Sequence, residues 1–477
     1  MKRAHLEKYA IEKDRLVFEV RVLDRLFSTS IWYKDVDLNK LAEKIGHKTL
    51  ENIVAHIAAF EMNKYGSLHL EEVDLGDLRK YVSPELAKLW GEIFVNVWGQ
   101  WRFENNLPNE KVPILISNHD YRLQDIDQLQ INETKTLNFF SGGKDSYVSC
   151  HLLKDAGINF DIIEYSSSIY GNRHEQASVR KNANEFSKNS EVYEMAIFDD
   201  FLDSPIVEYD GNQYHIHSLT AAETPASIFE TLPIALYKGH TELALGHEKS
   251  ANYPNLKWEL EDDCPINHQW GKSLEAQKLI ADYLRKNISS KIKYYSTLMP
   301  LSDPAIFSIF ALVHWQFQKQ AHSCNIEKPW CKRCAKCVYV WIYYLAFLDD
   351  KKVCDEIFDG ESLFEIKENF DLLRMLAGQE SHTPFECVGQ PEETRLALFL
   401  ARTKGYEQQI VFELTKDIDT RELINTANTQ LSIDRSFLHQ CDLPAKLEKY
   451  YIEIIEPQLD QKRQEVISII SNFQVKS

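Results

Sequence analysis

The pattern of hydrophobic and polar positions changes near residue 134, and this change divides the chain. Before it, alternation in RLVFEVRV and FSTSIWY predicts a β-hairpin, while LENIVAHIAAFEMNKY predicts a helix with an apolar face. After it, short apolar runs alternate with helical patterns to about residue 320, and beyond about residue 355 helical patterns dominate. The chain is thus predicted to begin as α+β, to continue in strand–helix units and to end in helices.

The repeated strand–helix units indicate the fold class. TKTLNFF is a predicted strand that leads into a helix over DSYVSCHLLKDAG, and a later strand leads into one helix over SDPAIFSIFALVHWQFQ. Such repeats predict an α/β fold, with a doubly wound, mostly parallel sheet that helices cover on both faces.

Ligands bind beyond the carboxyl ends of the strands in a sheet of this kind. The loops at 141–146 and 246–252, and the turn after Met299, each follow a predicted strand directly. We therefore expect these three loops to lie at one edge of the sheet.

Four regions are predicted along the chain. They are a separate N-terminal α+β module without visible chemistry (1–130), an α/β nucleotide-binding domain (131–322), a four-cysteine segment (323–350) and a helical C-terminal region (351–477).

Composition and charge exclude several classes of protein. Apolar residues make up 44% of the chain and charged residues 26%, as in soluble globular proteins. A net charge of −18 argues against a general binder of nucleic acid or of anionic membranes, although a local cationic pocket can still take an anionic small molecule. The first residues lack the apolar core of a signal peptide, and the longest apolar runs fall short of the roughly 18–20 residues that span a membrane. We expect a cytoplasmic protein, and the sequence predicts no oligomeric state.

The motif SGGKDS stands where a predicted strand meets a predicted helix. It lacks the spacing of a Walker loop and of a dinucleotide-binding loop. Glycines nevertheless let backbone N–H groups approach a phosphate, and the helix directs its positive end at the same place. An ordinary strand–turn–helix connection is the alternative. The predicted nucleotide-binding residues are Ser141 and Ser146 as hydrogen-bond donors, Gly142 and Gly143, Lys144 to neutralise phosphate, and Asp145 to help hold Mg²⁺.

SGGKDS resembles the PP-loop of the ATP pyrophosphatase superfamily. The resemblance implies an adenine-nucleotide α-hydrolase-like fold (a HUP domain) that binds ATP. It also implies attack at the α-phosphate, so that a substrate oxygen is adenylated and pyrophosphate leaves. Relatives in this superfamily include GMP synthetase, tRNA thiolases and 7-cyano-7-deazaguanine synthase.

Four of the nine cysteines stand close together in HSCNIEKPWCKRCAKC. Their spacing, C-x6-C-x2-C-x2-C, is typical of four thiolates around a structural Zn²⁺, and the neighbouring Lys332, Arg333 and Lys336 are expected to offset the negative charge. An iron–sulfur cluster and a redox-active CxxC pair are the alternatives. Deazaguanine synthases carry a similar site, which favours zinc. The predicted metal ligands are Cys324, Cys331, Cys334 and Cys337.

Three further stretches narrow the resemblance: GHEKSAN (246–252), INHQWGKSLE (266–275) and HTPFECVGQPEETR (382–395). Together with SGGKDS and the cysteines, they resemble the bacterial UDP-N-acetylmuramoyl-L-alanyl-L-glutamate epimerase family of peptidoglycan biosynthesis, from about residue 134 to about residue 400. The resemblance implies that ATP adenylates a terminal carboxylate, of an amino acid or a nucleotide-linked peptide, and that the α-carbon is then inverted.

The predicted chemistry is reasonable because adenylation removes the carboxylate charge that opposes loss of the α-proton. A base then takes the proton and an acid returns it to the other face. A ligase that captures the adenylate with a nitrogen nucleophile, similar to deazaguanine synthase, is one alternative, and a nucleotide-binding protein without turnover is another. The predicted catalytic residues are Lys144, Asp145, His247, Glu248 and Cys387, and the predicted substrate-binding residues are Lys249, Ser250, Asn267, His268 and Gln269.

Overall fold

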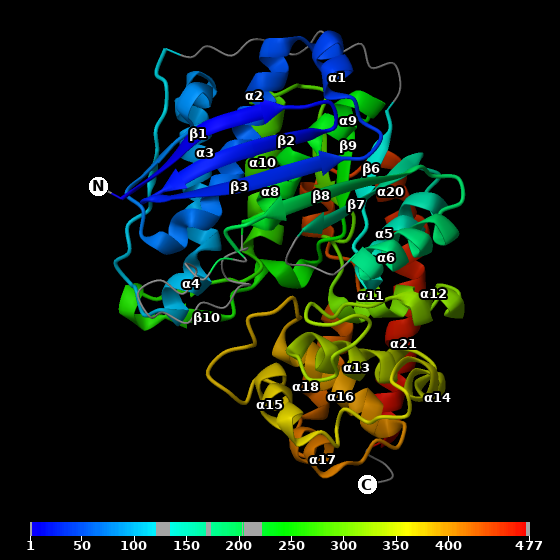
Figure 1. Ribbon diagram of the computed structural model, residues 1–477. Helices are drawn as coiled ribbons and strands as arrows, with labels where there is room; N and C mark the ends of the chain where they lie inside the picture. The colour runs from blue at the N-terminus through cyan, green and yellow to red at the C-terminus, as the bar shows by residue number, and fades with distance from the viewer. Residues whose placement is uncertain (1, 121–133, 168–172, 203, 205–221, 474–477) are drawn as a thin grey trace.

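The computed structural model describes residues 2–120, 134–167, 173–202, 204 and 222–473. Within these residues, ten strands form one sheet, and two short strands form a separate hairpin (Figure 1). The strands of the sheet are β1 (Arg3–Ile11), β2 (Arg15–Val22), β3 (Arg25–Tyr33), β4 (Glu72–Asp74), β5 (Ile114–Leu115), β6 (Thr136–Phe139), β7 (Phe160–Ser167), β8 (Val192–Asp199), β9 (Glu242–Leu245) and β12 (Lys293–Ser296). The hairpin consists of β10 (Leu256–Trp258) and β11 (Cys264–Ile266).

The sheet has the order β12-β9-β6-β7-β8-β3-β2-β1-β4-β5. The five strands from β12 to β8 are parallel, with Thr136 opposite Phe160 at the start of the β6–β7 pair. β8, β3, β2 and β1 then pair antiparallel, and β1, β4 and β5 pair parallel again. The prediction of an α/β fold with a large, mostly parallel sheet is thus confirmed.

The N-terminal strands belong to this same sheet, which the sequence reading did not anticipate. β3 pairs with β8, placing Ile31 opposite Ile197, and both side chains lie in one hydrophobic core. Figure 1 shows the blue strands β1 to β3 continuing into the sheet beside β8. The predicted separate module therefore does not have a sheet of its own.

Helices cover both faces of the parallel strands. Neighbouring residues Ile162 and Ile163 on β7 point to opposite faces and enter different cores. Helices α2, α3, α8, α9 and α10 pack on the side of Ile163, and α5, α6 and α11 pack on the side of Ile162. The helices up to α11 are α1 (Leu38–Ile45), α2 (His47–Glu61), α3 (Pro84–Val97), α4 (Gly99–Glu104), α5 (Lys144–Asp155), α6 (Arg173–Phe186), α8 (Glu223–Glu230), α9 (Leu232–Lys238), α10 (Leu274–Asn287) and α11 (Asp303–Phe310).

The long helix predicted over SDPAIFSIFALVHWQFQ is divided in two. α11 ends at Phe310, and α12 (Trp315–Gln320) begins after His314, whose side chain accepts from the backbone N–H of Gln316. The side-chain amide of Gln318 donates to the carbonyl oxygens of Phe310, Ala311 and Val313. It thereby satisfies carbonyl groups that the end of α11 leaves free.

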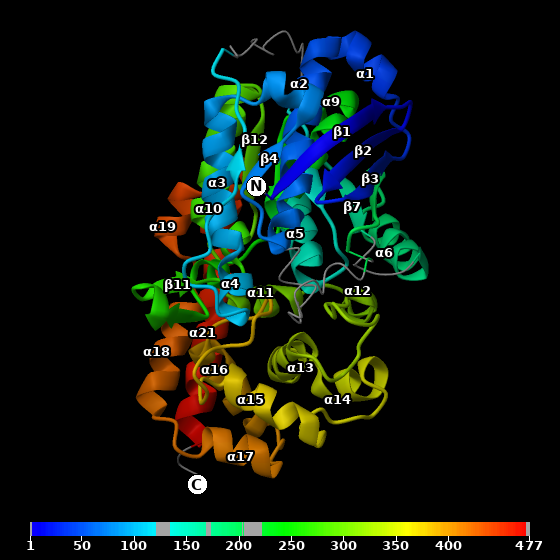
Figure 2. The same cartoon turned by 60° about the vertical axis from the view of Figure 1, so that its left-hand side comes forward.

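Most of the C-terminal helices form a lobe below the sheet in the view of Figure 1, whereas α20 lies at the level of the sheet near α5 and α19 lies beside α10 in Figure 2. At its centre is α13 (Ala335–Phe347), all of whose residues are buried, as expected for a helix that is apolar all round. In Figure 2, α13 lies among α14, α15 and α16. The predicted helical C-terminal region is confirmed. Its helices are α14 (Asp350–Lys352), α15 (Phe370–Leu376), α16 (Pro391–Thr403), α17 (Gln409–Thr415), α18 (Thr420–Gln430), α19 (Arg435–Gln440), α20 (Ala445–Tyr450) and α21 (Glu456–Phe473).

The apolar runs of the lobe are packed in the protein interior. Among the described residues, no helix combines the length and the apolar character needed to cross a membrane.

Candidate active site and cysteine cluster

A cavity of about 360 Å³ lies at the carboxyl ends of β6 and β9, between the sheet and the C-terminal lobe. Segments far apart in the sequence meet there, from Phe139 to Cys387. The predicted site residues that line it are Ser141, Gly143, Asp145, Ser146, His247, Glu248, His268, Gln269 and Cys387. Two of the three expected loops, 141–146 and 246–252, contribute to the cavity, and the turn after Met299 lies next to the second, since the N–H of Lys249 donates to the carbonyl oxygen of Leu301 at 2.8 Å.

The SGGKDS loop turns sharply between β6 and α5. Gly142 has a φ of +82°, and a Cβ at this position would lie 3.1 Å from side-chain carbons of both His322 and Val179. The backbone N–H of Ser141 donates to Oγ of Ser146 at 2.9 Å, which ties the two ends of the loop together. The loop therefore places the start of α5 at the cavity wall, where Gly143, Asp145 and Ser146 line it.

Lys144 is directed differently from the sequence interpretation. Its side chain is buried below the loop, and Nζ lies 2.6 Å from Oδ1 of Asp145 and 2.7 Å from Oδ1 of Asp303. Burial alone would lower the pKa of Lys144, but Asp145, Asp303 and Glu248 raise it above its usual value. Lys144 is not among the residues that line the cavity. Its visible contacts hold the two carboxylates in place.

His247 and Glu248 follow β9 directly and line the cavity. Ser296 on β12 fixes the backbone of His247 by accepting from its N–H at 2.7 Å and donating to its carbonyl oxygen at 2.8 Å. Burial and the charge of Lys272 hold the pKa of His247 well below its usual value, so its imidazole is neutral.

Glu248 has an unusually basic carboxylate. Burial, together with the carboxylates of Asp145 and Asp303, raises the pKa of Glu248 to about 7, against the opposing effect of Lys272 and Lys144. At neutral pH this side chain is therefore available both as an acid and as a base.

Three predicted substrate-binding residues hold the loops instead of lining the cavity. Nζ of Lys249 lies 2.9 Å from Oδ2 of Asp434. The hydroxyl of Ser250 donates to the buried carboxylate of Glu393, and the amide of Asn267 donates to the carbonyl oxygen of Ala251. The residues that line the cavity, as far as the structure describes them, include none of these three.

His268 and Gln269 do reach the cavity. Nδ1 of His268 lies 2.6 Å from Oε1 of Gln100 on α4, so the N-terminal region supports this wall. Burial lowers the pKa of His268 to about 4. The amide nitrogen of Gln269 donates to the carbonyl oxygen of Val388 at 3.1 Å, and within the described part of the chain its Oε1 has no hydrogen-bond partner.

Lysines that were not predicted as site residues also line the cavity. Nζ of Lys272 lies 2.8 Å from Sγ of Cys387, and Nζ of Lys336 donates to the carbonyl oxygen of Cys387. Lys328 is a third lysine in the wall. Lys272 lies within INHQWGKSLE, a stretch that the resemblance had singled out, so its position next to His268 and Gln269 was the available signal.

The charges around the cysteine cluster also differ from the prediction. Lys336 faces the active-site cavity, and Lys332 pairs with Asp359 at 3.2 Å and Glu361 at 2.6 Å. Arg333 is exposed. Two of the three cations expected to balance the thiolates therefore have other partners.

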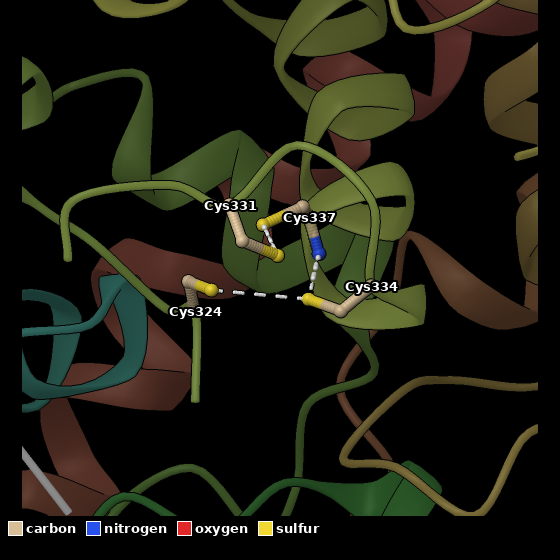
Figure 3. A group of neighbouring side chains, drawn as sticks. All are labelled: Cys324, Cys331, Cys334 and Cys337. Carbon is tan, nitrogen blue, oxygen red and sulfur yellow. Dashed lines mark hydrogen bonds between the residues drawn. The ribbon is translucent and has the colours of Figure 1, made fainter. Parts of the chain in front are cut away.

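The four predicted ligands of the cysteine cluster lie together (Figure 3), with their sulfurs all within 4.8 Å of one another. Cys324 and Cys334 are 3.9 Å apart, and Cys331 and Cys337 are 3.7 Å apart. A tetrahedron with metal–sulfur bonds of about 2.3 Å has sulfurs about 3.8 Å apart. Backbone N–H groups of Ile326 and Glu327 point at Sγ of Cys324. The thiol groups thus fit a tetrahedral metal ion.

The cluster and the cavity share one segment of chain. Residues that line the cavity stand directly beside cluster cysteines in the sequence. Ser323 and Lys336 line the cavity, and Cys324 and Cys337, which follow them, belong to the cluster. The cavity-lining members are His322, Ser323, Asn325, Lys328 and Lys336.

Two family models match parts of this chain. The MurL N-terminal domain matches residues 226–297, and the MurL C-terminal domain matches residues 315–429. The first match covers the loops after β9 and β11, and the second covers the cysteine cluster and Cys387.

Three relatives carry the name UDP-N-acetyl-alpha-D-muramoyl-L-alanyl-L-glutamate epimerase. The protein of Micromonospora sp. is 27% identical over 323 residues, 66% of this chain and 67% of the relative. That of Xanthomonas oryzae pv. oryzae is 24% identical over 349 residues, 71% and 72% of the two chains. That of Salinispora tropica is 32% identical over 173 residues, 35% and 36% of the two chains. Through the two domain matches and these three relatives, this chain is similar to the MurL epimerase family.

Proposed function

We propose that this chain is an ATP-dependent epimerase that inverts the α-carbon of the terminal glutamate of UDP-MurNAc-L-Ala-L-Glu or a similar peptide. The observation that carries the proposal is the meeting of the SGGKDS loop, His247, Glu248 and Cys387 in one cavity. The names of the relatives supply the substrate. The resemblance of the SGGKDS loop to a PP-loop supports the activating step, in which ATP adenylates the glutamate carboxylate and pyrophosphate leaves.

The nucleotide is proposed to bind with its phosphates at the SGGKDS loop. The backbone N–H groups that begin α5 and the hydroxyls of Ser141 and Ser146 are suited to phosphate oxygens. Asp145 lines the same wall and is proposed to hold Mg²⁺. Lys272, Lys328 and Lys336 bring positive charge to the cavity of an otherwise acidic protein, and this supports an anionic substrate.

Inversion is proposed to follow activation. Once the carboxylate charge is masked, a base can take the α-proton, and an acid can return a proton to the other face. Two side chains in the cavity are suited to taking up or donating this proton. His247 is neutral, and the pKa of Glu248 is about 7.

The cysteine cluster is proposed to hold Zn²⁺ in a structural role. Cys324, Cys331, Cys334 and Cys337 would occupy all four positions of a tetrahedral ion and leave no site for a water molecule. The metal would supply cross-linking, because it ties the segment that begins at His322 to the first turn of α13. This segment forms one wall of the cavity.

The decisive experiment incubates the protein with ATP, Mg²⁺ and UDP-MurNAc-L-Ala-L-Glu in D₂O, following pyrophosphate and deuterium at the glutamate α-carbon. The appearance of both, with the D-glutamyl product, supports the proposal. Pyrophosphate only when ammonia or an amine is added would indicate the nitrogen-capturing ligase instead. No pyrophosphate with any carboxylate would overturn the proposal in favour of nucleotide binding without turnover.

A pair of serine variants tests the location of the nucleotide. Ser146→Ala removes the hydroxyl that closes the loop, and we expect pyrophosphate release to fall by about tenfold or more. Ser308→Ala is the matched control, since its hydroxyl donates to the carbonyl oxygen of Pro304 within α11 and does not line the cavity. Equal activity of the two variants would contradict the assignment of the loop.

A further inference from the structure

The thiol of Cys387 and the ammonium of Lys272 form a pair inside the cavity. Nζ of Lys272 donates to Sγ of Cys387 at 2.8 Å, and both side chains line the cavity wall. Cys387 is partly exposed towards the cavity, in contrast to the buried Cys150 and Cys441. The ammonium is therefore positioned to stabilise negative charge that develops on the sulfur during a reaction.

The loop that carries Cys387 is held by side chains from several elements. The ammonium of Lys336 and the amide of Gln269 donate to the carbonyl oxygens of Cys387 and Val388. The amide of Asn255 donates to the carbonyl oxygen of Pro384 at 2.9 Å. This loop connects α15 and α16, so the C-terminal lobe presents the sulfur to the cavity at the sheet edge. The position of the thiol is therefore fixed by packing from both sides.

Polar atoms next to this pair have no partner within the part of the chain that the structure describes. They are Nδ1 of His247 and Oε1 of Gln269, and their side chains line the cavity. His247 is 7% exposed and Gln269 is 5% exposed, so water does not readily satisfy these atoms. These two atoms are available to the donors and acceptors of a ligand at this end of the cavity.

The charged groups that face the thiol come from three directions. Lys272 and Lys336 approach it from the loop after β11 and from α13, and Glu386 is its neighbour in sequence, bound to the amide of Asn325 at 3.1 Å. Burial alone would lower the pKa of Lys272, yet Cys387, Glu248 and Asp145 raise it above its usual value, so the lysine stays charged. His268, close to the same lysine, is neutral at pH 7.

We propose that Cys387, held as a thiolate by Lys272, removes the α-proton of the activated substrate, and that Glu248 returns a proton to the α-carbon. This inference rests on the proposed function. The C–H bond breaks as the S–H bond forms, and its electron pair moves into the enolate of the activated carboxyl group. Glu248, which projects from the sheet edge and not from the lobe, then donates its proton to the carbon. Proton exchange with solvent then returns Cys387 and Glu248 to their starting protonation states. Lys272 is a positioning residue in this scheme.

The first test needs no substrate. The rate of alkylation of Cys387 by iodoacetamide is measured against pH by peptide mass spectrometry, in the wild type and in Lys272→Met and Lys272→Arg. Cys264, partly exposed but outside the cavity, serves as the reference in the same digest. We expect the rate of alkylation of Cys387 at neutral pH to fall by about tenfold or more in Lys272→Met and to stay near the wild-type rate in Lys272→Arg. An unchanged rate in Lys272→Met would overturn the role of the lysine.

The second test separates proton transfer from activation. In D₂O with ATP, Mg²⁺ and UDP-MurNAc-L-Ala-L-Glu, we expect Cys387→Ala to continue to release pyrophosphate while deuterium incorporation falls by about 100-fold or more. Glu248→Gln is expected to incorporate deuterium without inversion, because removal of the proton remains and delivery to the other face is lost. Wild-type rates of deuterium incorporation in Cys387→Ala would refute the inference. Absence of pyrophosphate from the wild type would instead refute the proposed function, and the alkylation profile would still report on the thiol–lysine pair.

Discussion

Alanine at Gly142 is expected to damage the nucleotide loop far more than alanine at Gly157, although both glycines have positive φ. These glycines stand at the two ends of α5, with φ values of +82° and +66°. A left-handed backbone costs a non-glycine residue about 1–2 kcal/mol, so both variants carry this cost. Only at Gly142 would the new Cβ also press on His322 and Val179, at 3.1 Å from each, whereas no atom lies within 4 Å at Gly157. The crowding adds about 1 kcal/mol.

The loop of Gly142→Ala can relieve this strain of about 2–3 kcal/mol by leaving the geometry that presents its N–H groups. Nucleotide binding must then restore that geometry, which weakens the affinity by about 30- to 150-fold. Titration calorimetry with ATP and Mg²⁺ measures the affinity, and urea unfolding measures the stability of both variants. We expect Gly157→Ala to lose stability but to keep the wild-type affinity. If Gly142→Ala also bound ATP as the wild type does, the loop would not be the phosphate site.

Three further predictions concern the buried charges and the cysteines. Glu248→Gln should raise the free energy of unfolding at about pH 8 by up to about 3 kcal/mol. Folding raises the pKa of this carboxyl from 4.5 to about 7, so the wild type loses stability as the pH rises between these values. The urea midpoints of variant and wild type should therefore converge below about pH 4. Lys144→Met should cost about 3–5 kcal/mol by leaving the buried carboxylate of Asp303 without its lysine partner and with only the hydroxyl of Tyr339 as a donor. Asp303→Asn in the same chain should recover part of that loss in a double-mutant cycle. Metal analysis should show that Cys331→Ser loses stoichiometric zinc, because this cysteine is one of the four proposed ligands. Cys354→Ser is the control and should keep the zinc, since Cys354 lies outside the cluster and contacts the hydroxyl of Tyr406. Retained zinc in Cys331→Ser would contradict the ligand set.

Features written in local sequence patterns were predictable. The 3.6- and 2-residue periodicities gave the parallel strands and their helices, because each element buries one or both faces against its neighbours. The short gaps between Cys331, Cys334 and Cys337 brought their sulfurs together through a single turn. The cavity position of the SGGKDS loop followed from the strand that precedes it.

Features that depend on distant partners were not predictable in the same way. No local pattern states that β3 pairs with β8, or that Gln100 supports His268. The direction of Lys144 is set by Asp303, a carboxylate far along the chain, and the motif alone suggested a phosphate contact. Lys272 belongs to no recognisable sequence motif. Its importance becomes clear only in the structure, where its Nζ lies 2.8 Å from Sγ of Cys387.

The pairing of β3 with β8 has a consequence for synthesis of the chain. Thr29 and Asp199, joined by a hydrogen bond across this pair, are separated by 170 residues. At about 5–20 residues per second, the ribosome delivers β8 about 10–30 s after β3. Throughout this interval the three-stranded meander β1–β3 has an unpaired edge at β3, which is a template for association with another chain. Nascent chains that stop before Val192 are therefore expected to self-associate, and pairing of β8 with β3 covers the exposed edge.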